Sequence, residues 1–387
     1  MSAIRRVRLQ TLRWTRRGRA FDRFLPVASD SDSESPGAGW VLTIESDAGT
    51  GRHVWSTGIN GFAAAAVPQV AHWLLGQDPF QRERIWSDLS HFWRKHDRTG
   101  IGCIDIALWD LAGRAYGVGV SQLLGGYRTA LPAYVSTLHG AATGSLSRPE
   151  DYADFAVQCA ELGYTAFKIH GWNGEDIPRE VANVLGVRAA VGERMALMLD
   201  PSCGYSTFAD ALRVGRACDE AGFFWYEDPY REGGISVHAH RRLGELLTTP
   251  LMLGEHVRGF AAHVDQIAGR GTDFVRADAD LDGGITGVMK IAHAAEGFGL
   301  DVELHGPGPA HRACMSAIRN TNFYELALSA PSLLRASDDF PVYLDYSDDV
   351  LAAGPGGTFP VPGGAGLGVE LDDDWIDAHV VDEFVAG

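Results

Sequence analysis

From about residue 131 onward, the sequence alternates between short apolar runs and longer amphipathic stretches. The stretches at 149–163, 178–192, 208–221 and 287–298 have the spacing of helices with one apolar face. Continuous apolar runs that alternate with helices indicate a parallel sheet covered by helices on its outer face. The eight runs are Leu131–Ser136, Thr165–His170, Ala196–Asp200, Phe223–Asp228, Pro250–Glu255, Phe274–Asp278, Leu300–His305 and Asn322–Leu326.

Eight strand–helix units between residues 131 and 326 fit a barrel of the triosephosphate isomerase type. A doubly wound open sheet is the alternative, but no glycine-rich phosphate-binding fingerprint follows the first run. The chain ahead of these units differs, because strand-like segments are followed by helical patterns at about 62–76, 80–96 and 101–116. After a Gly/Pro-rich loop at 354–368, we expect the C-terminal segment to pack back on the N-terminal region.

Charged side chains stand at the ends of these apolar runs. In a parallel barrel, the C-terminal ends of successive strands converge on one face, where active sites are built. The intervals between Asp200, Glu227 and Glu255 are 27 and 28 residues, about one strand–helix unit each. Three carboxylates on adjacent strands repel one another unless a cation lies between them, and their hard oxygen ligands favour Mg²⁺ over zinc. The other charged residues at or near strand ends are Lys168, His170, Asp278, His305 and Glu325.

These motifs resemble those of the enolase superfamily, and within it the mandelate racemase/muconate lactonizing enzyme family, in its mandelate racemase-like subgroup. The order and spacing of the motifs carry the resemblance, which covers nearly the whole chain. The matching segments are Cys103–Arg114 with Leu123–Gly126, Glu227-Asp228-Pro229, Gly254-Glu255, Asp278 with Gly283–Gly287, His305, and Gly366–Glu370.

The resemblance implies a modified (β/α)7β barrel with an α+β capping domain. The expected domains are a capping domain at 1–128, a catalytic barrel at 129–350, and a C-terminal segment at 351–387 that completes the capping domain. It also implies a homo-oligomer, since family members are commonly dimers or octamers.

The resemblance further implies a role for each strand-end residue. Asp200, Glu227 and Glu255 would bind one Mg²⁺ per subunit. Asp278 would orient His305 as the catalytic base. Glu325 would donate a hydrogen bond to the substrate carboxylate.

The second strand departs from the family pattern. The usual Lys-x-Lys motif is replaced by Lys168-Ile169-His170. Lys168 is therefore expected to be the cation beside the substrate carboxylate. An imidazole stands at the position of the second base, and His170 is equally consistent with a catalytic base or a polar residue of the pocket wall.

Substrate contacts are weaker predictions. His256 follows the third expected metal ligand, and Ser202 lies two residues beyond the first, where a turn residue is the simpler reading. In the family, loops of the capping domain cover the barrel mouth, which here points to Arg19, Arg23 and His53.

The expected reaction is Mg²⁺-dependent removal of the proton α to a carboxylate through an enediolate, most simply to dehydrate an acid sugar to a 2-keto-3-deoxy acid. A single imidazole can serve such a lyase as both base and acid. A racemase or epimerase of a 2-hydroxy acid is the alternative, and it requires two bases. A barrel that binds a ligand without turning it over is a third reading.

Composition limits the partners. The formal net charge is −17, from 33 Lys+Arg and 50 Asp+Glu, which argues against a basic nucleic-acid-binding face. The five cysteines form no CxxC pair, which argues against a structural zinc site or a disulfide scaffold. No segment reaches the ~18 apolar residues of a membrane span. We therefore expect a soluble, cytoplasmic protein without nucleic-acid or membrane partners.

The N-terminal residues are rich in arginine and free of acids. Val7 and Leu9, followed by Leu12 and Trp14, alternate with one break, which is typical of a bulged edge strand. A transit peptide is the alternative.

Overall fold

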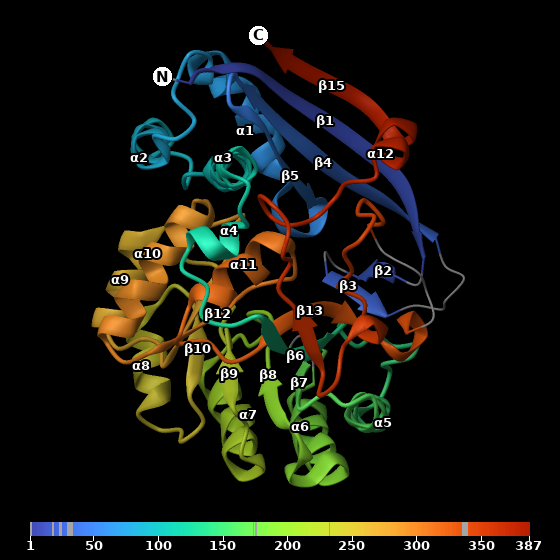
Figure 1. Ribbon diagram of the computed structural model, residues 1–387. Helices are drawn as coiled ribbons and strands as arrows, with labels where there is room; N and C mark the ends of the chain where they lie inside the picture. The colour runs from blue at the N-terminus through green and yellow to red at the C-terminus, as the bar shows by residue number, and fades with distance from the viewer. Residues whose placement is uncertain are drawn as a thin grey trace.

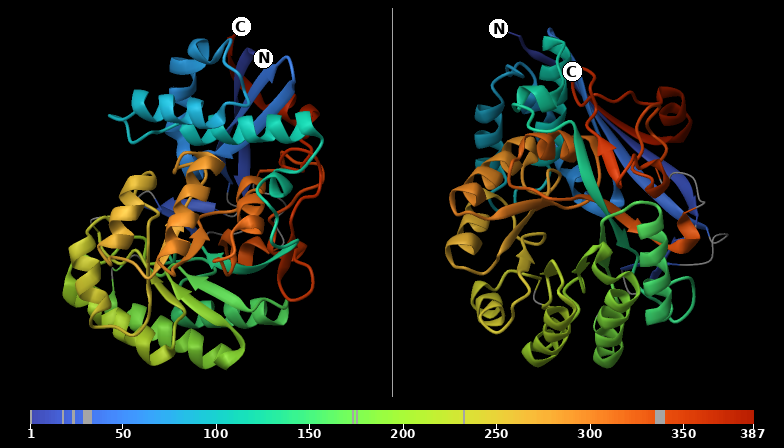
Figure 2. Two further views of the ribbon diagram at one scale, coloured as in Figure 1. Left: turned by 60° about the vertical axis from the view of Figure 1, so that its left-hand side comes forward. Right: turned by 60° about the horizontal axis from the view of Figure 1, so that its bottom comes forward.

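The computed structural model describes residues 2–17, 19–22, 25–28, 34–172, 174, 176–231, 233–334 and 340–387, with the side chains of 17–33 and 57–60 outside this description. An antiparallel sheet with its helices forms one end of the molecule, and a curled parallel sheet surrounded by helices forms the other (Figures 1 and 2). Both termini lie at the end of the antiparallel sheet (Figure 1). In the described chain, no helix is long and apolar enough to cross a membrane.

The parallel sheet confirms the predicted barrel class, because each of the eight apolar runs overlaps one strand. The strand order is β12-β11-β10-β9-β8-β7-β6-β13, and every neighbouring pair along it is parallel. The strands are β6 (Ala130–Thr137), β7 (Ala166–Ile169), β8 (Ala196–Leu199), β9 (Trp225–Glu227), β10 (Leu251–Leu253), β11 (Phe274–Ala277), β12 (Asp301–Leu304) and β13 (Tyr324–Ser329).

A helix follows each of the first seven barrel strands within the described chain, which gives the expected (β/α)7β order. The helices are α5 (Pro149–Glu161), α6 (Ile177–Val191), α7 (Phe208–Ala221), α8 (Val237–Gly244), α9 (Phe260–Ala268), α10 (Gly284–Gly297) and α11 (Pro309–Ala317). Between β12 and β13 the described residues form no ladder. The seam is joined instead by two hydrogen bonds: Val302 N–H donates to Asn320 O at 2.7 Å, and Asn322 N–H donates to Glu303 Oε1 at 2.8 Å.

Alternation along the strands explains how polar groups reach the interior of an apolar sheet. Successive side chains of a strand point to opposite faces. In β8, Leu197 packs in the core between strands and helices, whereas Met198 belongs to an inner cluster with Trp225 of β9. The next inward positions on these two strands are Asp200 and Glu227, both buried. The apolar inner cluster therefore lies beneath a polar layer at the C-terminal ends of the strands.

The N-terminal sheet has the order β15-β1-β4-β5 and is antiparallel. The predicted bulge is confirmed, because the register of β1 against β15 shifts between Thr11 and Leu12. The expectation of an edge strand is wrong, since β15 from the other end of the chain covers that edge. The elements of this region are β1 (Ile4–Arg17), β2 (Arg19–Asp22), β3 (Leu25–Ala28), β4 (Glu34–Ser46), β5 (Gly49–Ser56), α1 (Thr57–Leu74), α2 (Arg82–Phe92), α3 (Ile101–Tyr116), α4 (Val120–Leu123) and β15 (Val380–Ala386).

The helices beside the N-terminal sheet fix it to the barrel. On α3, the carboxylate of Asp105 accepts hydrogen bonds from Thr286 N–H at 2.9 Å and Thr286 Oγ1 at 2.7 Å. Trp109 Nε1 donates to the same hydroxyl at 3.0 Å. At Gly102, an added Cβ would lie 2.4 Å from Asp280 O, so the helix backbone approaches the end of β11 closely. This contact places the N-terminal domain against the barrel mouth.

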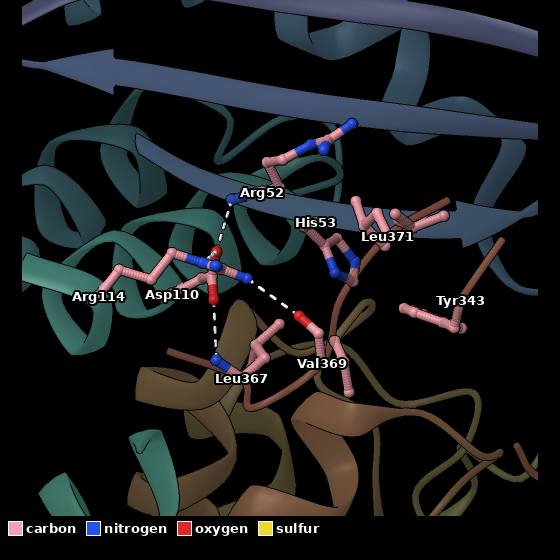
Figure 3. A pocket seen from close by; sticks show the side chains of 9 residues that line it. Arg52, His53, Asp110, Arg114, Tyr343, Leu367, Val369 and Leu371 are labelled. Carbon is pink, nitrogen blue, oxygen red and sulfur yellow. Dashed lines mark hydrogen bonds and ion pairs between the residues drawn. The ribbon is translucent and has the colours of Figure 1, made fainter. Parts of the chain in front are cut away.

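The C-terminal segment is held at the same junction by a buried carboxylate, Asp110 (Figure 3). Its Oδ1 accepts from Leu367 N–H at 2.8 Å, and its Oδ2 accepts from Arg52 N–H at 2.8 Å and Arg114 Nε at 2.9 Å. A cavity of about 10 Å³ beside these groups has room for one water molecule. Ahead of Leu367, β14 (Thr358–Pro360) pairs with β6, and after it the segment continues through α12 (Asp373–His379) to β15.

Candidate active site

Three carboxylates lie together at the C-terminal ends of adjacent barrel strands. Asp200 follows β8, Glu227 ends β9, and Glu255 lies two residues after β10. One oxygen from each lies within 4.8 Å of the others, so the three could hold one metal ion. Asp200 and Glu227 are buried, and Glu255 is partly exposed, which leaves the open side of the group on the side of Glu255.

Lys168 of β7 lies beneath this group and is fully buried. Its Nζ lies 3.4 Å from Asp200 Oδ2, 3.0 Å from Glu227 Oε2 and 2.9 Å from Glu325 Oε1. Burial opposes the charge of the ammonium group, but Glu227 and Glu325 outweigh it and hold the pKa of Lys168 well above its usual value. The lysine is therefore a fixed cation within the carboxylate cluster.

Arg276 of β11 is a second fixed cation, which the sequence analysis missed. The guanidinium is fully buried, with Nε 2.9 Å from Glu227 Oε1 and Nη2 2.5 Å from Glu325 Oε2. Its Nη1 donates to Tyr134 Oη at 3.0 Å. Arg276 lies inside an apolar run, two residues before Asp278. Residues two apart on a strand point to the same face, so the inward direction expected of Asp278 could have identified Arg276 as a residue of the site.

Glu325 of β13 lies between the two cations. Besides Lys168 and Arg276, its carboxylate accepts the N–H of Gly306 at 2.7 Å. Burial raises the pKa of Glu325, but Arg276 and Lys168 outweigh burial and hold that pKa well below its usual value. These contacts suit an ionised Glu325 that accepts hydrogen bonds. The expected role of Glu325 as a hydrogen-bond donor to the substrate carboxylate would need its protonated form.

Asp278 and His305 form a hydrogen-bonded pair at the ends of β11 and β12, next to Glu255. His305 Nδ1 lies 2.8 Å from Asp278 Oδ2, and its Nε2 lies 3.5 Å from Glu255 Oε1. The imidazole is 22% exposed. Burial lowers the pKa of His305, but Glu255 and Asp278 outweigh burial and raise it to about 9. A cation bound to Glu255 would reduce the first of these two contributions.

Asp278 is itself held by neighbours. Its Oδ1 accepts the N–H of Asp280 at 2.7 Å and lies 3.5 Å from His311 Nε2. Burial raises the pKa of Asp278, but hydrogen bonds to His305 and His311 outweigh burial and keep the pKa of this carboxyl far below its usual range. The orientation of His305 is therefore fixed through an ionised carboxylate.

His170 lies beside the metal-binding group rather than free in the mouth. Its Nε2 lies 3.0 Å from Asp200 Oδ2, and its Nδ1 lies 2.7 Å from Thr137 O. Both ring nitrogens thus face acceptors of the protein. This geometry orients Asp200, and it leaves neither nitrogen directed at a substrate proton.

A neighbouring imidazole, His139, was also missed. It lies three residues past the first apolar run, its ring centroid is 4.8 Å from that of His170, and its Nε2 lies 3.2 Å from Ser202 Oγ. Burial and the nearby His170 lower the pKa of His139 to about 3, so the ring is neutral. Ser202 N–H donates to Asp200 Oδ1 at 2.7 Å, so Ser202 supports the first carboxylate through its backbone.

Of the weaker predictions, His256 lies at the mouth, with Nε2 3.9 Å from Glu255 Oε1. His53 is buried at the domain junction, with Nε2 2.6 Å from Asp280 Oδ1. This contact between domains is one that sequence spacing could not reveal, and the substrate contact of His53 stays a prediction. Arg23 lies outside the described residues, as does the side chain of Arg19.

Known proteins match both parts of this chain. Residues 41–125 match the family described as the mandelate racemase / muconate lactonizing enzyme N-terminal domain. Residues 151–375 match the family described as enolase C-terminal domain-like.

Individual relatives cover most of the chain. D-galactarolactone cycloisomerase of Agrobacterium fabrum is 30% identical over 334 residues, which are 80% of this chain and 83% of that protein. D-xylonate dehydratase of Haloferax volcanii is 27% identical over 377 residues, 89% of this chain and 86% of that protein. A crystal structure of D-glucarate dehydratase from Agrobacterium tumefaciens complexed with magnesium has a TM-score of 0.87 and 30% identity, and covers 98% of this chain and 99% of its own.

Proposed function

Because this chain belongs to the mandelate racemase/muconate lactonizing enzyme family of the enolase superfamily, we propose that it is a Mg²⁺-dependent acid-sugar dehydratase. It would remove the proton α to the substrate carboxylate and release a 2-keto-3-deoxy acid. The observation that carries this proposal is the group of Asp200, Glu227 and Glu255 on adjacent strands, facing the Asp278–His305 pair. Dehydratases among the relatives, one of them complexed with magnesium, support the same reaction class.

The donor set fits Mg²⁺. All three candidate ligands offer carboxylate oxygens, and Mg²⁺ prefers hard oxygen ligands over nitrogen or sulfur. The ligand set is incomplete on its exposed side, which leaves positions for water and substrate. When bound, Mg²⁺ would neutralise negative charge that develops on the substrate carboxylate.

His305 would carry the proton. In the neutral form of His305, Nδ1–H donates to Asp278, which leaves the lone pair of Nε2 for the α-proton at C2. The electron pair of the C–H bond moves into the carboxylate and gives an enediolate. When the carboxylate re-forms, the C3–O bond breaks, and the hydroxyl leaves as water with the proton returned by His305. The resulting enol takes a proton at C3 and loses the proton of its C2 hydroxyl, which gives the 2-keto acid.

Lys168 and Arg276 would stabilise the negative charge of the enediolate. They lie between the carboxylates of Glu227 and Glu325 in a fully buried layer, so their positions are fixed before the reaction begins. Preorganised charges of this kind are usually the largest contribution to catalysis of such steps. We assign Arg276 and Glu325 as positioning residues for Lys168 and Glu227.

The position of His170 favours dehydration over racemisation. A racemase or epimerase needs a second base on the other face of the substrate. The ring nitrogens of His170 face Asp200 and Thr137 O, so we assign it to orienting Asp200. Dehydration needs only the one imidazole.

A panel of aldonic and aldaric acids tests this function. Each acid is incubated with the protein and Mg²⁺, and 2-keto acid is measured with and without a chelator. We expect keto acid from at least one member of the panel, only when Mg²⁺ is present. Exchange of the α-proton with deuterated water without keto acid would favour an epimerase, and neither signal from any acid would favour a ligand-binding barrel.

Sugar lactones belong in the same panel, because one relative is named a cycloisomerase of D-galactarolactone. In a lactone whose ring oxygen lies on the β-carbon, the same α-proton removal would expel that oxygen in place of hydroxide. Product from lactones alone would assign the chain to this second reaction.

We also propose that the chain forms a homo-oligomer in the cytoplasm, with the domains expected from the sequence at 1–128, 129–350 and 351–387. Family resemblance supports the oligomer, and light scattering of the purified protein tests it.

A further inference from the structure

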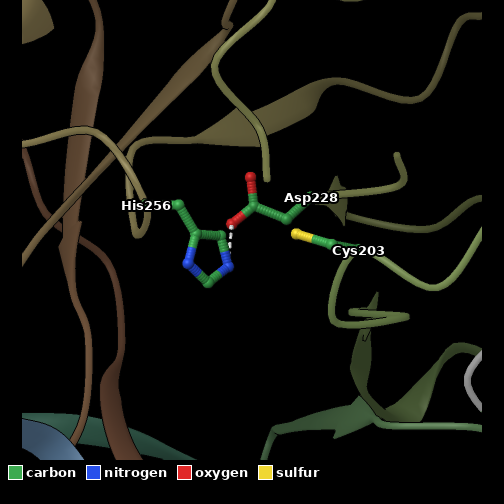
Figure 4. Close-up of side chains that lie close together, drawn as sticks. All are labelled: Cys203, Asp228 and His256. Atoms are coloured by element: carbon green, nitrogen blue, oxygen red, sulfur yellow. Dashed lines mark ion pairs between the residues drawn. The ribbon is translucent and has the colours of Figure 1, made fainter. Parts of the chain in front are cut away.

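A second group of potential metal ligands lies beside the three carboxylates. Cys203, Asp228 and His256 each offer one ligand atom, and these atoms all lie within 4.8 Å of one another (Figure 4). Each follows one of the proposed Mg²⁺ ligands by one to three residues in the sequence. The same strand ends therefore bring both groups together, and the second group shares no residue with the first.

Asp228 is the member whose side-chain oxygens lack hydrogen-bond partners among the described residues. Its side chain is fully buried, and neither carboxylate oxygen accepts a hydrogen bond from the part of the chain that the structure describes. In the described chain, the one basic side chain near this carboxyl is His256, whose Nε2 lies 3.7 Å from Asp228 Oδ2. Lys168 and Arg276, by contrast, contact other carboxylates of the mouth. Both oxygens of this buried carboxyl are therefore free to act as ligands, and a bound cation would stabilise its ionised form.

The other two members provide access and a fixed geometry. The N–H of Cys203 donates to Asp228 O at 2.8 Å, which holds the cysteine next to the carboxylate. His256 is 36% exposed and Cys203 is partly exposed, so an ion can enter from the mouth. The other four cysteines are buried.

The donor atoms select a different metal from the neighbouring group. A thiolate, an imidazole nitrogen and a carboxylate oxygen suit Zn²⁺ and related transition metals, whereas Mg²⁺ takes oxygen ligands. The thiolate and the carboxylate together carry two negative charges, which match one divalent ion. Three protein ligands leave a fourth tetrahedral position for water or substrate.

We propose that Cys203, Asp228 and His256 bind a divalent transition-metal ion such as Zn²⁺ or Co²⁺, at a site separate from the proposed Mg²⁺ site. Binding forms metal–sulfur, metal–nitrogen and metal–oxygen bonds and releases the thiol proton of Cys203 to solvent. The reaction needs no oxidant or reductant.

Titration of the full chain with Co²⁺ in excess Mg²⁺ tests this site. A thiolate ligand gives Co²⁺ a charge-transfer band in the near ultraviolet, and the all-oxygen Mg²⁺ group cannot produce this band. We expect the band to saturate at one Co²⁺ per chain and to disappear when Zn²⁺ displaces Co²⁺. Absence of the band in the wild-type protein would overturn the proposal. Because the readout is spectroscopic, it is independent of the dehydratase activity.

Variants assign the ligands. Mutation of a residue that only hydrogen-bonds to a metal ligand lowers metal affinity by about 10–100-fold. Loss of a direct ligand should therefore weaken Zn²⁺ binding by at least about 100-fold. Cys203→Ala should abolish the band, and Cys159→Ala, a matched change in α5, should retain it. His256→Gln should weaken binding, whereas His238→Gln on the exposed surface of α8 should not. A band that persists in Cys203→Ala, or equal effects of the two histidine variants, would refute the site.

Discussion

Replacing Arg276 with methionine should destabilise the barrel by several kcal/mol, although methionine is apolar and of similar length. The guanidinium compensates the buried carboxylates of Glu227 at 2.9 Å and Glu325 at 2.5 Å. Lys168 still contacts both carboxylates at 3.0 and 2.9 Å, so we count the loss as that of one buried pair. Breaking a buried pair by removing one partner costs about 3–5 kcal/mol.

Thermal unfolding in EDTA measures this effect without metal compensation. With an unfolding entropy of ~2.1 cal/mol/K per residue, 387 residues correspond to about 0.8 kcal/mol/K. A loss of about 3–5 kcal/mol therefore lowers the Tm by roughly 4–6 °C if the chain unfolds as one unit. The matched control is Lys290→Met, which breaks a surface pair with Glu83 at 2.8 Å whose side chains are 31% and 71% exposed. That change should cost less than about 1 kcal/mol.

A second substitution separates charge from packing. Glu325→Gln alone should destabilise the protein, because it removes a partner of Lys168 and Arg276. In the Arg276→Met background the same change should restore stability by about 1 kcal/mol or more, because it removes an uncompensated charge. The reasoning is refuted if the free energy of unfolding of Arg276→Met lies within about 1 kcal/mol of the wild-type value. It is also refuted if the destabilising effects of Arg276→Met and Glu325→Gln simply add in the double variant.

Three further results are expected. His170→Asn should weaken Mg²⁺ binding by about 10–100-fold, because His170 orients Asp200, while kcat recovers at saturating Mg²⁺; a kcat loss that Mg²⁺ does not relieve would make His170 a base. Asp278→Asn should lower kcat by about 10²–10⁴-fold by misorienting His305, with circular dichroism unchanged; near-wild-type kcat would contradict the proposed pair. Burial raises the pKa of Glu180 from 4.5 to about 7, so the folded state holds this proton more tightly than the unfolded chain. The corresponding contribution to the free energy of unfolding is present below pH 4.5 and is lost as the pH rises to about 7, by up to roughly 3 kcal/mol. In urea unfolding, Glu180→Gln should lack this dependence of the unfolding free energy on pH, and an unchanged dependence would exclude Glu180 as its source.

The barrel could be predicted because local patterns encode it. Apolar runs of strand length and the helical spacing between them identify the eight strands, and strand-end positions bring Asp200, Glu227 and Glu255 together. The N-terminal sheet was only partly predictable. The C-terminal segment was expected to pack on the N-terminal region, and it does so, but no local pattern specified that it adds the strand β15 beside β1.

Within the site, the sequence could indicate which residues converge but not how they pair. Arg276 lies inside an apolar run and looks like a position for a core residue, yet it contacts two carboxylates. His170 is at the expected strand end, but the direction of its ring toward Asp200 depends on packing. His53 contacts Asp280 across the domain junction. Side-chain direction and contacts between domains are thus the parts that required the structure.

Proton NMR of the reaction in deuterated water tests the central claim most directly. With Mg²⁺ and a turned-over acid sugar, dehydration through an enol predicts one deuterium at C3 of the 2-keto-3-deoxy product. His305→Asn should abolish both product formation and exchange at C2, since this imidazole removes the α-proton. Product without deuterium at C3, or dehydration that persists in His305→Asn, would contradict the proposed mechanism.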